Sequence, residues 1–243
     1  MKLCLPLLHN NLAIGMTENA TGKTALLVGA TGLVGGHCLE FLLKSPRYSL
    51  VICLVRKKMP IINDKLNQIV VDFDNLAVDA AQIKADDVFC CLGTTIKIAK
   101  SKENFKKVDY HYPLQVAQIA QQNGAQQFLI VTAMGADKAS LIFYNAVKGQ
   151  LEHDVQALKY QSLHILQPSL LLGHREEARL GEKVGERVMN ALDFVFKGPL
   201  RKYRAIEARA VAFAMVHLAT ANQAGTHTHP SNELETIYNQ YAH

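Results

Sequence analysis

Tyr144 and Lys148, four positions apart, are the residues best suited to acid–base chemistry in this sequence. A spacing of four places two side chains on one face of a helix, one turn apart. An ammonium group beside a phenol lowers the pKa of the phenol, so that the phenol can serve as a general acid or base near neutral pH. The same lysine can also bind the ribose of a nicotinamide cofactor. Because the chain contains eight tyrosines and many lysines, this spacing alone is a weak signal.

A run of glycines near the start of the chain is suited to binding a phosphate. Gly29, Gly32 and Gly35 follow a short apolar run at residues 24–28 and precede a helical pattern of leucines. This order predicts a buried strand, a tight turn and the first turn of a helix, in which the glycines let a pyrophosphate approach the backbone. The start of the helix then offers free N–H groups and the positive end of its dipole to the phosphate.

The end of the next apolar run decides between the two nicotinamide dinucleotides. NAD sites place an acidic residue about 20 positions after the glycines, where it holds the ribose 2′-hydroxyl. Here Arg56 stands at about this distance, and Lys57 and Lys58 follow it. A guanidinium group can bind a 2′-phosphate through two hydrogen bonds, whereas a carboxylate would repel it. The position therefore favours NADP(H), and the alternative is a solvated basic end of a strand.

In the remaining chain, short apolar runs typical of strands alternate with segments whose apolar residues have helical spacing. The expected strands are residues 24–28, 50–55, 68–71, 87–92, 128–131 and 163–166, and the expected helices are residues 105–122, 144–158, 181–197 and 205–221. This alternation predicts an α/β fold, a Rossmann-like doubly wound parallel sheet with a small helical C-terminal cap. Ligands bind such sheets beyond the carboxyl ends of the strands. One crevice should therefore collect the residues at the strand ends, which are Gly29, Arg56, Asp72, Gly93, Thr132 and Pro168.

Composition and charge narrow the class of protein. Of the 243 residues, 49% are hydrophobic and 19% are charged, which is ordinary for a soluble α/β enzyme. We expect residues 1–22 to form a flexible extension and residues 23–243 to form one NAD(P)-binding domain with C-terminal helices. The net charge of +5 is modest and spread along the chain, so a nucleic acid is not an expected partner. The apolar stretch at residues 3–8 is too short to cross a membrane, and we expect no membrane partner.

The five cysteines are Cys4, Cys38, Cys53, Cys90 and Cys91. None has the spacing of a metal site and most lie in apolar runs, so we expect buried free thiols in a reducing compartment. From this we expect a cytoplasmic protein without a bound metal. His227 and His229 look like a pair of metal ligands but lack acidic or cysteine partners nearby, and we interpret them as exposed tail residues.

Several motifs in a fixed order resemble a known family. The glycine pattern, together with Tyr144 and Lys148, is similar to the short-chain dehydrogenase/reductase superfamily in its extended or atypical branch. From about residue 24 to residue 209, the chain is similar more narrowly to the HIV Tat-interactive protein oxidoreductase family. This narrower similarity rests on residues 90–95, 107–110, 135–138, 144–149 and 171–179. The resemblance implies a Rossmann protein that binds NADPH.

The resemblance also implies most of the cofactor contacts, to which we add Gly29 and Thr94 from the ends of the first and fourth expected strands. Together with Asp72 and Phe73, the expected contacts are Gly29, Thr31, Gly32, Leu33, Val34, Gly35, Arg56, Leu92, Gly93, Thr94, Tyr144, Lys148, Leu171 and Arg179. Asp72 and Phe73, which end the third expected strand, would flank the adenine, but they can equally be a turn residue and a core aromatic. The basic run at Lys97, Lys100, Lys102, Lys106 and Lys107 is interpreted as a solvated face, with a phosphate-bearing substrate as the alternative.

One departure from the superfamily pattern bears directly on catalysis. The superfamily usually completes a triad with a serine or threonine hydroxyl just after the fifth strand. Here Thr132 is followed by Ala133, and the alanine holds the place that looks catalytic. Thr132 can supply the hydroxyl only if the chain bends there, since neighbouring residues of a strand face opposite sides. The candidate catalytic residues are thus Tyr144, Lys148 and Thr132.

Two functions remain open at this point. The first is an oxidoreductase that transfers a hydride between NADP(H) and an unknown small carbonyl or alcohol, with Tyr144 exchanging the proton. The second is a non-catalytic NADPH-binding regulator that presents a redox-dependent surface. A sugar-nucleotide epimerase is disfavoured because only about 95 residues follow Lys148. A homodimer and a protein partner both stay open.

Overall fold

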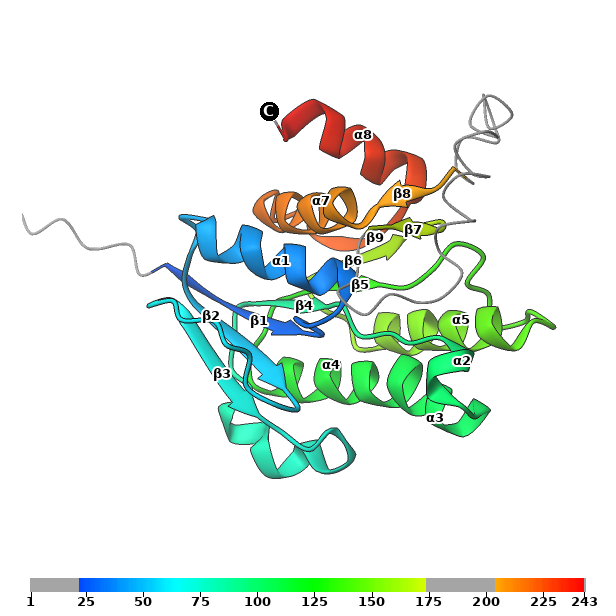
Figure 1. The fold of residues 1–243 in the computed structure, drawn as a ribbon, viewed down its shortest axis with the longest axis horizontal. Helices are drawn as coiled ribbons and strands as arrows, with labels where there is room; N and C mark the ends of the chain where they lie inside the picture. The colour runs from blue at the N-terminus through cyan, green and yellow to red at the C-terminus, as the bar shows by residue number, and fades with distance from the viewer. Residues whose placement is uncertain (1–21, 174–203, 243) are drawn as a thin grey trace, which may run out of the picture.

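The computed structural model describes residues 22–173 and 204–242. Within these ranges a parallel sheet of seven strands has the order β3-β2-β1-β4-β5-β6-β9 (Figure 1). Its strands are β1 (Lys23–Val28), β2 (Tyr48–Val55), β3 (Leu66–Val70), β4 (Asp87–Cys90), β5 (Gln127–Val131), β6 (Ser162–Gln167) and β9 (Gly225–Pro230). A second, small sheet pairs β7 (Leu171–Leu172) with β8 (Ile206–Glu207). The strand order reverses direction between β1 and β4, which is where such folds bind dinucleotides.

Helices cover both faces of the large sheet (Figure 1). The helices α1 (Leu33–Lys44), α7 (Ala208–Thr220) and α8 (Ser231–Tyr241) lie on one face, and α4 (Tyr112–Gln122) and α5 (Phe143–Ala157) lie on the other. The short elements are η1 (Phe73–Gln82), α2 (Ile96–Ala99), α3 (Lys102–Lys106) and the π-helical turn η2 (Lys107–His111). The predicted Rossmann-like doubly wound parallel sheet, followed by a helical C-terminal part of the chain, is confirmed.

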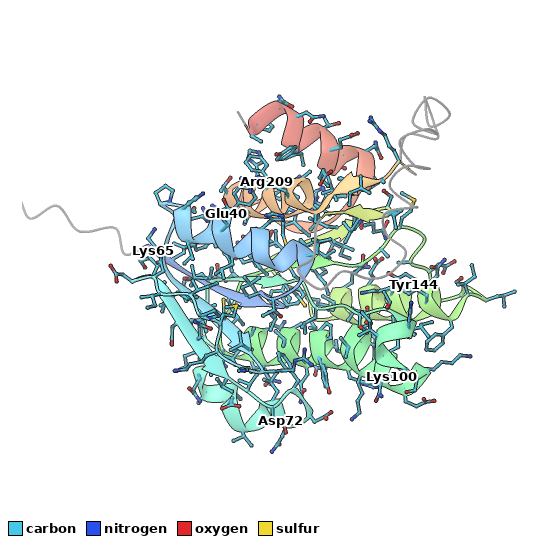
Figure 2. All side chains as sticks on the ribbon, viewed as in Figure 1. Glu40, Lys65, Asp72, Lys100, Tyr144 and Arg209 are labelled. Carbon is cyan, nitrogen blue, oxygen red and sulfur yellow. The ribbon has the colours of Figure 1, made fainter. Side chains whose placement is uncertain are left out.

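Two apolar cores result from the alternation of side chains along the strands. Leu27 and Leu129 belong to the core under α1 and α7, whereas Leu26 and Phe128, one position earlier on the same strands, belong to the core under α4 and α5. Hydrogen bonds at the surface also link the two helices that cover the first core. Glu40 on α1 accepts hydrogen bonds from Lys44 and from Arg209 on α7 (Figure 2). These bonds hold the pKa of Glu40 down at about 2.

Most element boundaries lie within a few residues of those predicted, but three predictions need correction. The helix expected at residues 105–122 begins three residues earlier, as α3, and passes through the π turn η2 before α4. The first positions of the helix expected at residues 205–221 belong instead to strand β8, and the helix α7 begins at Ala208. The tail expected at residues 227–229 is the edge strand β9, and its His229 is only 5% exposed.

The strand β9 escaped prediction because its sequence, GTHTHP, contains no apolar run. It forms because its backbone pairs with β6 in register from Ser162 with Gly225 to Gln167 with Pro230. Side-chain polarity gives no warning of such pairing. The expected helix at residues 181–197 and the expected extension, apart from Gly22, lie outside the described residues. No helix in the described ranges is long and apolar enough to cross a bilayer.

Candidate functional site

The glycine turn between β1 and α1 forms the cradle that the sequence predicts. Gly29 has φ +86°, and a Cβ added there would lie 2.6 Å from the carbonyl oxygen of Cys91. A Cβ on Gly35 would lie 2.0 Å from the carbonyl oxygen of Gly29, so only glycine lets α1 pack this closely on the turn. Helix α1 begins at Leu33 with no side-chain cap and no acidic residue in its first turn. Its free N–H groups therefore suit an anionic phosphate.

Residues expected near the cofactor follow the neighbouring strand ends. Thr31 and Gly32 complete the glycine turn, and Leu33 and Val34 open α1. Leu92, Gly93 and Thr94 follow β4, while Leu171 lies in β7 and packs against the core under α1. Because parallel strands end on the same edge of a sheet, the segments after β1, β2, β4, β5 and β6 meet at one edge. Arg179 lies outside the described residues.

The basic end of β2 is free to bind an anion. Arg56, Lys57 and Lys58 directly follow β2 and are exposed. β2 is the neighbour of β1 in the sheet, so Arg56 lies one strand away from the glycine turn. Among the described residues no carboxylate forms an ion pair with Arg56. The contact of Arg56 with the 2′-phosphate of NADP stays a prediction.

The segment after β3 contains a cap and a core aromatic. The carboxylate of Asp72 accepts a hydrogen bond from the backbone N–H of Asp74 at 3.0 Å and so caps η1. Phe73 is buried, and its ring lies 5.5 Å from that of Tyr112. Their expected contact with adenine stays a prediction.

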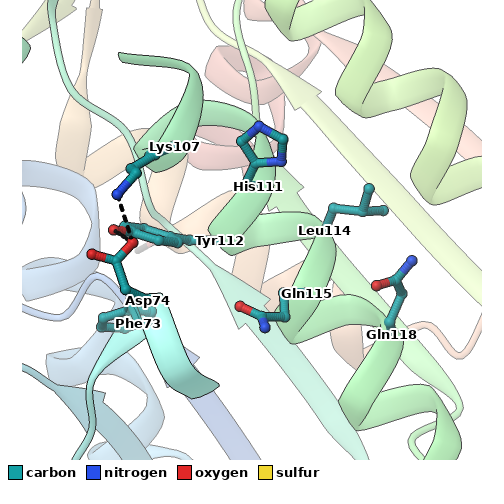
Figure 3. A pocket seen from close by; sticks show the side chains of 8 residues that line it. All are labelled: Phe73, Asp74, Lys107, His111, Tyr112, Leu114, Gln115 and Gln118. Carbon is teal, nitrogen blue, oxygen red and sulfur yellow. Dashed lines mark hydrogen bonds and ion pairs between the residues drawn. The ribbon is translucent and has the colours of Figure 1, made fainter. Parts of the chain in front are cut away.

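A hollow of about 360 Å³ lies next to this segment, between η1 and α4 (Figure 3). Its lining consists of Phe73, Asp74, Lys107, His111, Tyr112, Leu114, Gln115 and Gln118. The carboxylate of Asp74 pairs with Lys107 at 3.0 Å and accepts a hydrogen bond from the Tyr112 hydroxyl at 2.8 Å. Lys107 is thus engaged with Asp74, while the other lysines of the basic run are exposed on α2, α3 and the residues between them.

A buried ion pair lies at the centre of the expected catalytic region. The Nζ atom of Lys148 is 2.8 Å from Oδ1 of Asp109, and the two side chains are 3% and 1% exposed. The other carboxylate oxygen of Asp109 accepts a hydrogen bond from the backbone N–H of Thr94 at 2.8 Å. A Cβ on Gly93 would come within 4 Å of both side chains. Asp109 thereby connects Lys148 on α5 to the loop after β4.

Asp109 is a site residue that reasoning from the individual residues missed. It lies in the π turn η2, where the helix widens by one residue, and such turns are frequent at functional sites. Only the motif Lys107-Val108-Asp109-Tyr110, part of the family resemblance, pointed toward it. Burial raises the pKa of Asp109, although Lys148 and the Thr94 N–H act in the opposite direction.

Tyr144 lies in the first turn of α5 (Figure 2). The centroid of its ring is 5.5 Å from that of the Phe105 ring. Burial raises the pKa of Tyr144 above its ordinary value; Lys148 lowers it, and Asp109 adds to the rise. The expectation that Lys148 lowers this pKa overall is therefore wrong. The physical reason is that Asp109 neutralises the ammonium while burial disfavours the phenolate. Tyr144 is thus a neutral phenol in the free protein. Burial lowers the pKa of Lys148, but Asp109 and Tyr144 outweigh it, and the pKa is raised.

The residue after β5 does not present its hydroxyl freely to the site. β5 ends at Val131, and the Oγ1 atom of Thr132 donates a hydrogen bond to Oε1 of Glu152 at 2.5 Å. Glu152 is buried on α5, one turn beyond Lys148. The hydrogen bond engages the only hydroxyl at residues 131–133. Glu152, like Asp109, is a residue that reasoning from the individual residues did not indicate.

Comparisons with known proteins agree with this geometry. Residues 29–171 match the model of an NAD(P)H-binding family. Protein HTATIP2 of Rattus norvegicus is 35% identical over 174 residues, which cover 70% of this chain and 72% of the rat protein. Protein FMP52, mitochondrial, of Debaryomyces hansenii is 30% identical over 203 residues, covering 81% of this chain and 88% of the yeast protein.

Solved structures show the same fold at low sequence identity. MoeE5 in complex with UDP-glucose and NAD superposes with a TM-score of 0.65 at 15% identity, covering 90% of this chain and 82% of that one. The oxidoreductase ylbE from Lactococcus lactis superposes with a TM-score of 0.59 at 16% identity, covering 90% and 99%.

The fold and the glycine turn, together with the family match, define a Rossmann protein that binds a nicotinamide dinucleotide. The chain belongs to the NAD(P)H-binding family, and among its relatives are HTATIP2 and the FMP52 proteins.

The expected cytoplasmic location is contradicted by these relatives. Several FMP52 proteins that match this chain at 30–35% identity are named mitochondrial. The expectation rested on free cysteines, which indicate a reducing environment but not which compartment provides it.

Proposed function

We propose that this protein is an NADPH-dependent reductase of small carbonyl compounds, with Tyr144 as the proton donor. The observation that carries the proposal is the buried Lys148–Asp109 pair, which lies beside Gly93 at the carboxyl edge of the sheet. A buried ion pair next to a tyrosine on the same helix face is costly to maintain, and perturbed groups of this kind cluster at functional sites.

The residues present fit the cofactor. Gly29 and Gly35 let the turn and α1 pack directly against the backbone carbonyls of Cys91 and Gly29, and the uncapped start of α1 then offers its N–H groups to a pyrophosphate. Arg56 would hold the 2′-phosphate, and Lys148 would hold the nicotinamide ribose. When bound, the reduced nicotinamide supplies a hydride. Tyr144 gives its proton to the carbonyl oxygen of the substrate as that oxygen gains negative charge.

The protonation of Tyr144 supports the direction of the reaction. A tyrosine phenol is neutral at physiological pH, and burial moves its pKa further from neutrality. A neutral phenol can donate a proton for carbonyl reduction, whereas alcohol oxidation requires a base. We therefore propose reduction as the favoured direction.

The second candidate, an NADPH-binding regulator without catalysis, is favoured by one observation. The hydroxyl of Thr132 is engaged with Glu152, and Ala133 has none, so no hydroxyl at residues 131–133 is free to polarise a carbonyl. Under this alternative the same residues bind NADPH but transfer no hydride.

Replacing the proton donor distinguishes the two candidates. We expect Tyr144→Phe to remove most NADPH oxidation with a panel of aldehydes, ketones and quinones, by about 100-fold or more, and to leave NADPH affinity within about threefold. The matched control is Tyr241→Phe, because Tyr241 is exposed at the end of α8. Tight NADPH binding with no turnover of any compound by the parent protein would favour the regulator.

A further inference from the structure

Glu152 is a buried carboxyl group that the proposed reaction does not use. It follows Lys148 by four residues and Tyr144 by eight, so the three side chains lie on one face of α5. It is 8% exposed. Its oxygens accept hydrogen bonds from Oγ1 of Thr132 at 2.5 Å and from Nε2 of Gln167 at 3.0 and 3.1 Å. Since Thr132 follows β5 and Gln167 ends β6, Glu152 attaches the catalytic face of α5 to two strand ends.

The charges around Glu152 do not balance. In the described part of the chain no lysine, arginine or histidine forms an ion pair with it, and Lys148 pairs with Asp109 instead. Two ionised carboxylates and one ammonium would leave a buried net charge of −1, which is costly. Uptake of one proton removes this charge. The ammonium of Lys148 and the backbone N–H of Thr94 both stabilise the ionised form of Asp109. Glu152 is therefore the group that takes the proton.

The surrounding groups agree with that assignment. The side chains that face the cluster are Lys148 and Tyr144 from α5, Asp109 from η2, Thr132 and Gln167 from the strand ends, and Cys90 from β4. Burial raises the pKa of the Cys90 thiol to about 12, so it stays neutral. Burial also raises the pKa of Glu152, against the hydrogen bonds from Thr132 and Gln167 and the charge of Lys148.

The hydrogen bonds accommodate either protonation state without moving a heavy atom. When Glu152 is ionised, the Thr132 hydroxyl donates to it. When Glu152 is protonated, it can donate to Oγ1 of Thr132, whose own proton then goes to the carbonyl oxygen of Leu166 at 3.3 Å. The Gln167 amide donates to the carboxyl group in both states.

We propose that Glu152 is a proton-switched positioning residue for the Tyr144–Lys148 pair, an inference that rests on the function proposed above. Neutral Glu152 leaves the ammonium of Lys148 with Asp109, beside Gly93 and the predicted ribose position. Ionised Glu152, one helical turn from Lys148, competes with Asp109 for the same ammonium. NADPH affinity therefore falls as pH rises through the ionisation of Glu152.

The first test observes the proton directly and needs no substrate. The full-length protein is labelled with ¹³C at the glutamate side-chain carboxyl, so that infrared bands of glutamate shift and those of aspartate do not. We expect a C=O stretch of a protonated glutamic acid that persists to higher pH than those of exposed glutamates and disappears as pH rises further, and that is absent in Glu152→Gln. Loss of every labelled band together with those of the exposed glutamates would overturn the proposal.

The second test measures NADPH binding by calorimetry from about pH 6 to about pH 9. We expect the parent protein to lose affinity by about tenfold in all as pH rises through the infrared transition, while Glu152→Gln, which mimics the neutral form, stays within about twofold of one value after correction for the phosphate of the cofactor. Glu152→Leu, which breaks the bonds to Thr132 and Gln167, should bind weakly at every pH. Parallel profiles for the parent and Glu152→Gln would overturn the switch and leave only a structural role. Absence of carbonyl turnover would reject the proposed reductase without affecting either measurement.

Discussion

Ala133 holds the position at which the family resemblance implies a catalytic hydroxyl, and the hydroxyl of its neighbour Thr132 donates to Glu152. In enzymes of acyl transfer, one preorganised donor to a developing oxyanion contributes about 2.7–4 kcal/mol. The neutral phenol of Tyr144 alone is a weaker arrangement than a phenol assisted by a second donor. At the scale of single residues, this predicts a slow reductase that one substitution can improve.

We expect Ala133→Ser to raise NADPH-dependent turnover of simple carbonyls by about tenfold or more. Ala133→Cys is the matched control, since it adds similar volume with only a weak hydrogen-bond donor. The measurement is NADPH oxidation at saturating cofactor. Brisk parent turnover that Ala133→Ser leaves unchanged would show that another group already polarises the carbonyl.

At the scale of elements, two histidines and a glutamate connect strand β6 to the edge strand β9 and to helix α8. His164 on β6 lies 2.9 Å from His229 on β9, and His229 lies 2.7 Å from Glu233 on α8. The other ring nitrogen of His164 lies 3.1 Å from the hydroxyl of Ser162. Burial, with smaller contributions from His229 and His227, lowers the pKa of His164 from 6.5 to about 4.

This pairing makes the folded protein sensitive to acid. The unfolded chain binds a proton at His164 below about pH 6.5, whereas the folded chain resists it until about pH 4, so stability falls as pH decreases through this window. We expect the contribution of His164 to cost about 2 kcal/mol at pH 5 relative to pH 7.5, measured by urea unfolding at both values. His164→Gln should remove this part of the pH dependence, and His227→Gln should keep it. An equal loss of stability in parent and His164→Gln would contradict the assignment.

At the scale of the whole molecule, the proposed cofactor site collects elements from both halves of the sheet. The glycine turn follows β1, Arg56 follows β2, and Lys148 comes from α5 beyond β5. A ligand that binds only this assembled edge stabilises the entire fold by mass action.

We expect NADPH at about 100 times its Kd to stabilise the protein by about 2.7 kcal/mol, which corresponds to a rise in Tm of roughly 5–10 °C for a chain of this size. NADH at the same concentration should raise Tm by less, because Arg56 gains no phosphate partner. Arg56→Ala should bring the two shifts together, while Lys58→Ala serves as a control of equal charge change. Equal shifts for NADPH and NADH in the parent would refute the predicted preference for NADP.

Features that depend on neighbours in the chain were determined by the sequence alone. The turn at Gly29 and Gly35, the basic end of β2 and the one-turn separation of Tyr144 from Lys148 follow from backbone freedom and helical spacing, which act over a few residues. The order of strands and helices follows from apolar periodicity. These local patterns were sufficient to predict the class of fold, and they point to the carboxyl edge of the sheet for the proposed site.

What the tertiary structure decided depends on groups far apart in sequence. Asp109 approaches Lys148 across 39 positions, Thr132 approaches Glu152 across 20, and His164 approaches His229 across 65. The periodicity of a sequence does not indicate which polar side chains will be buried together. Burial can also reverse the direction of a pKa shift that neighbouring charges alone would produce. Lys148 by itself would lower the pKa of Tyr144, but the pair formed with Asp109 in a buried site cannot offset desolvation, and the pKa rises.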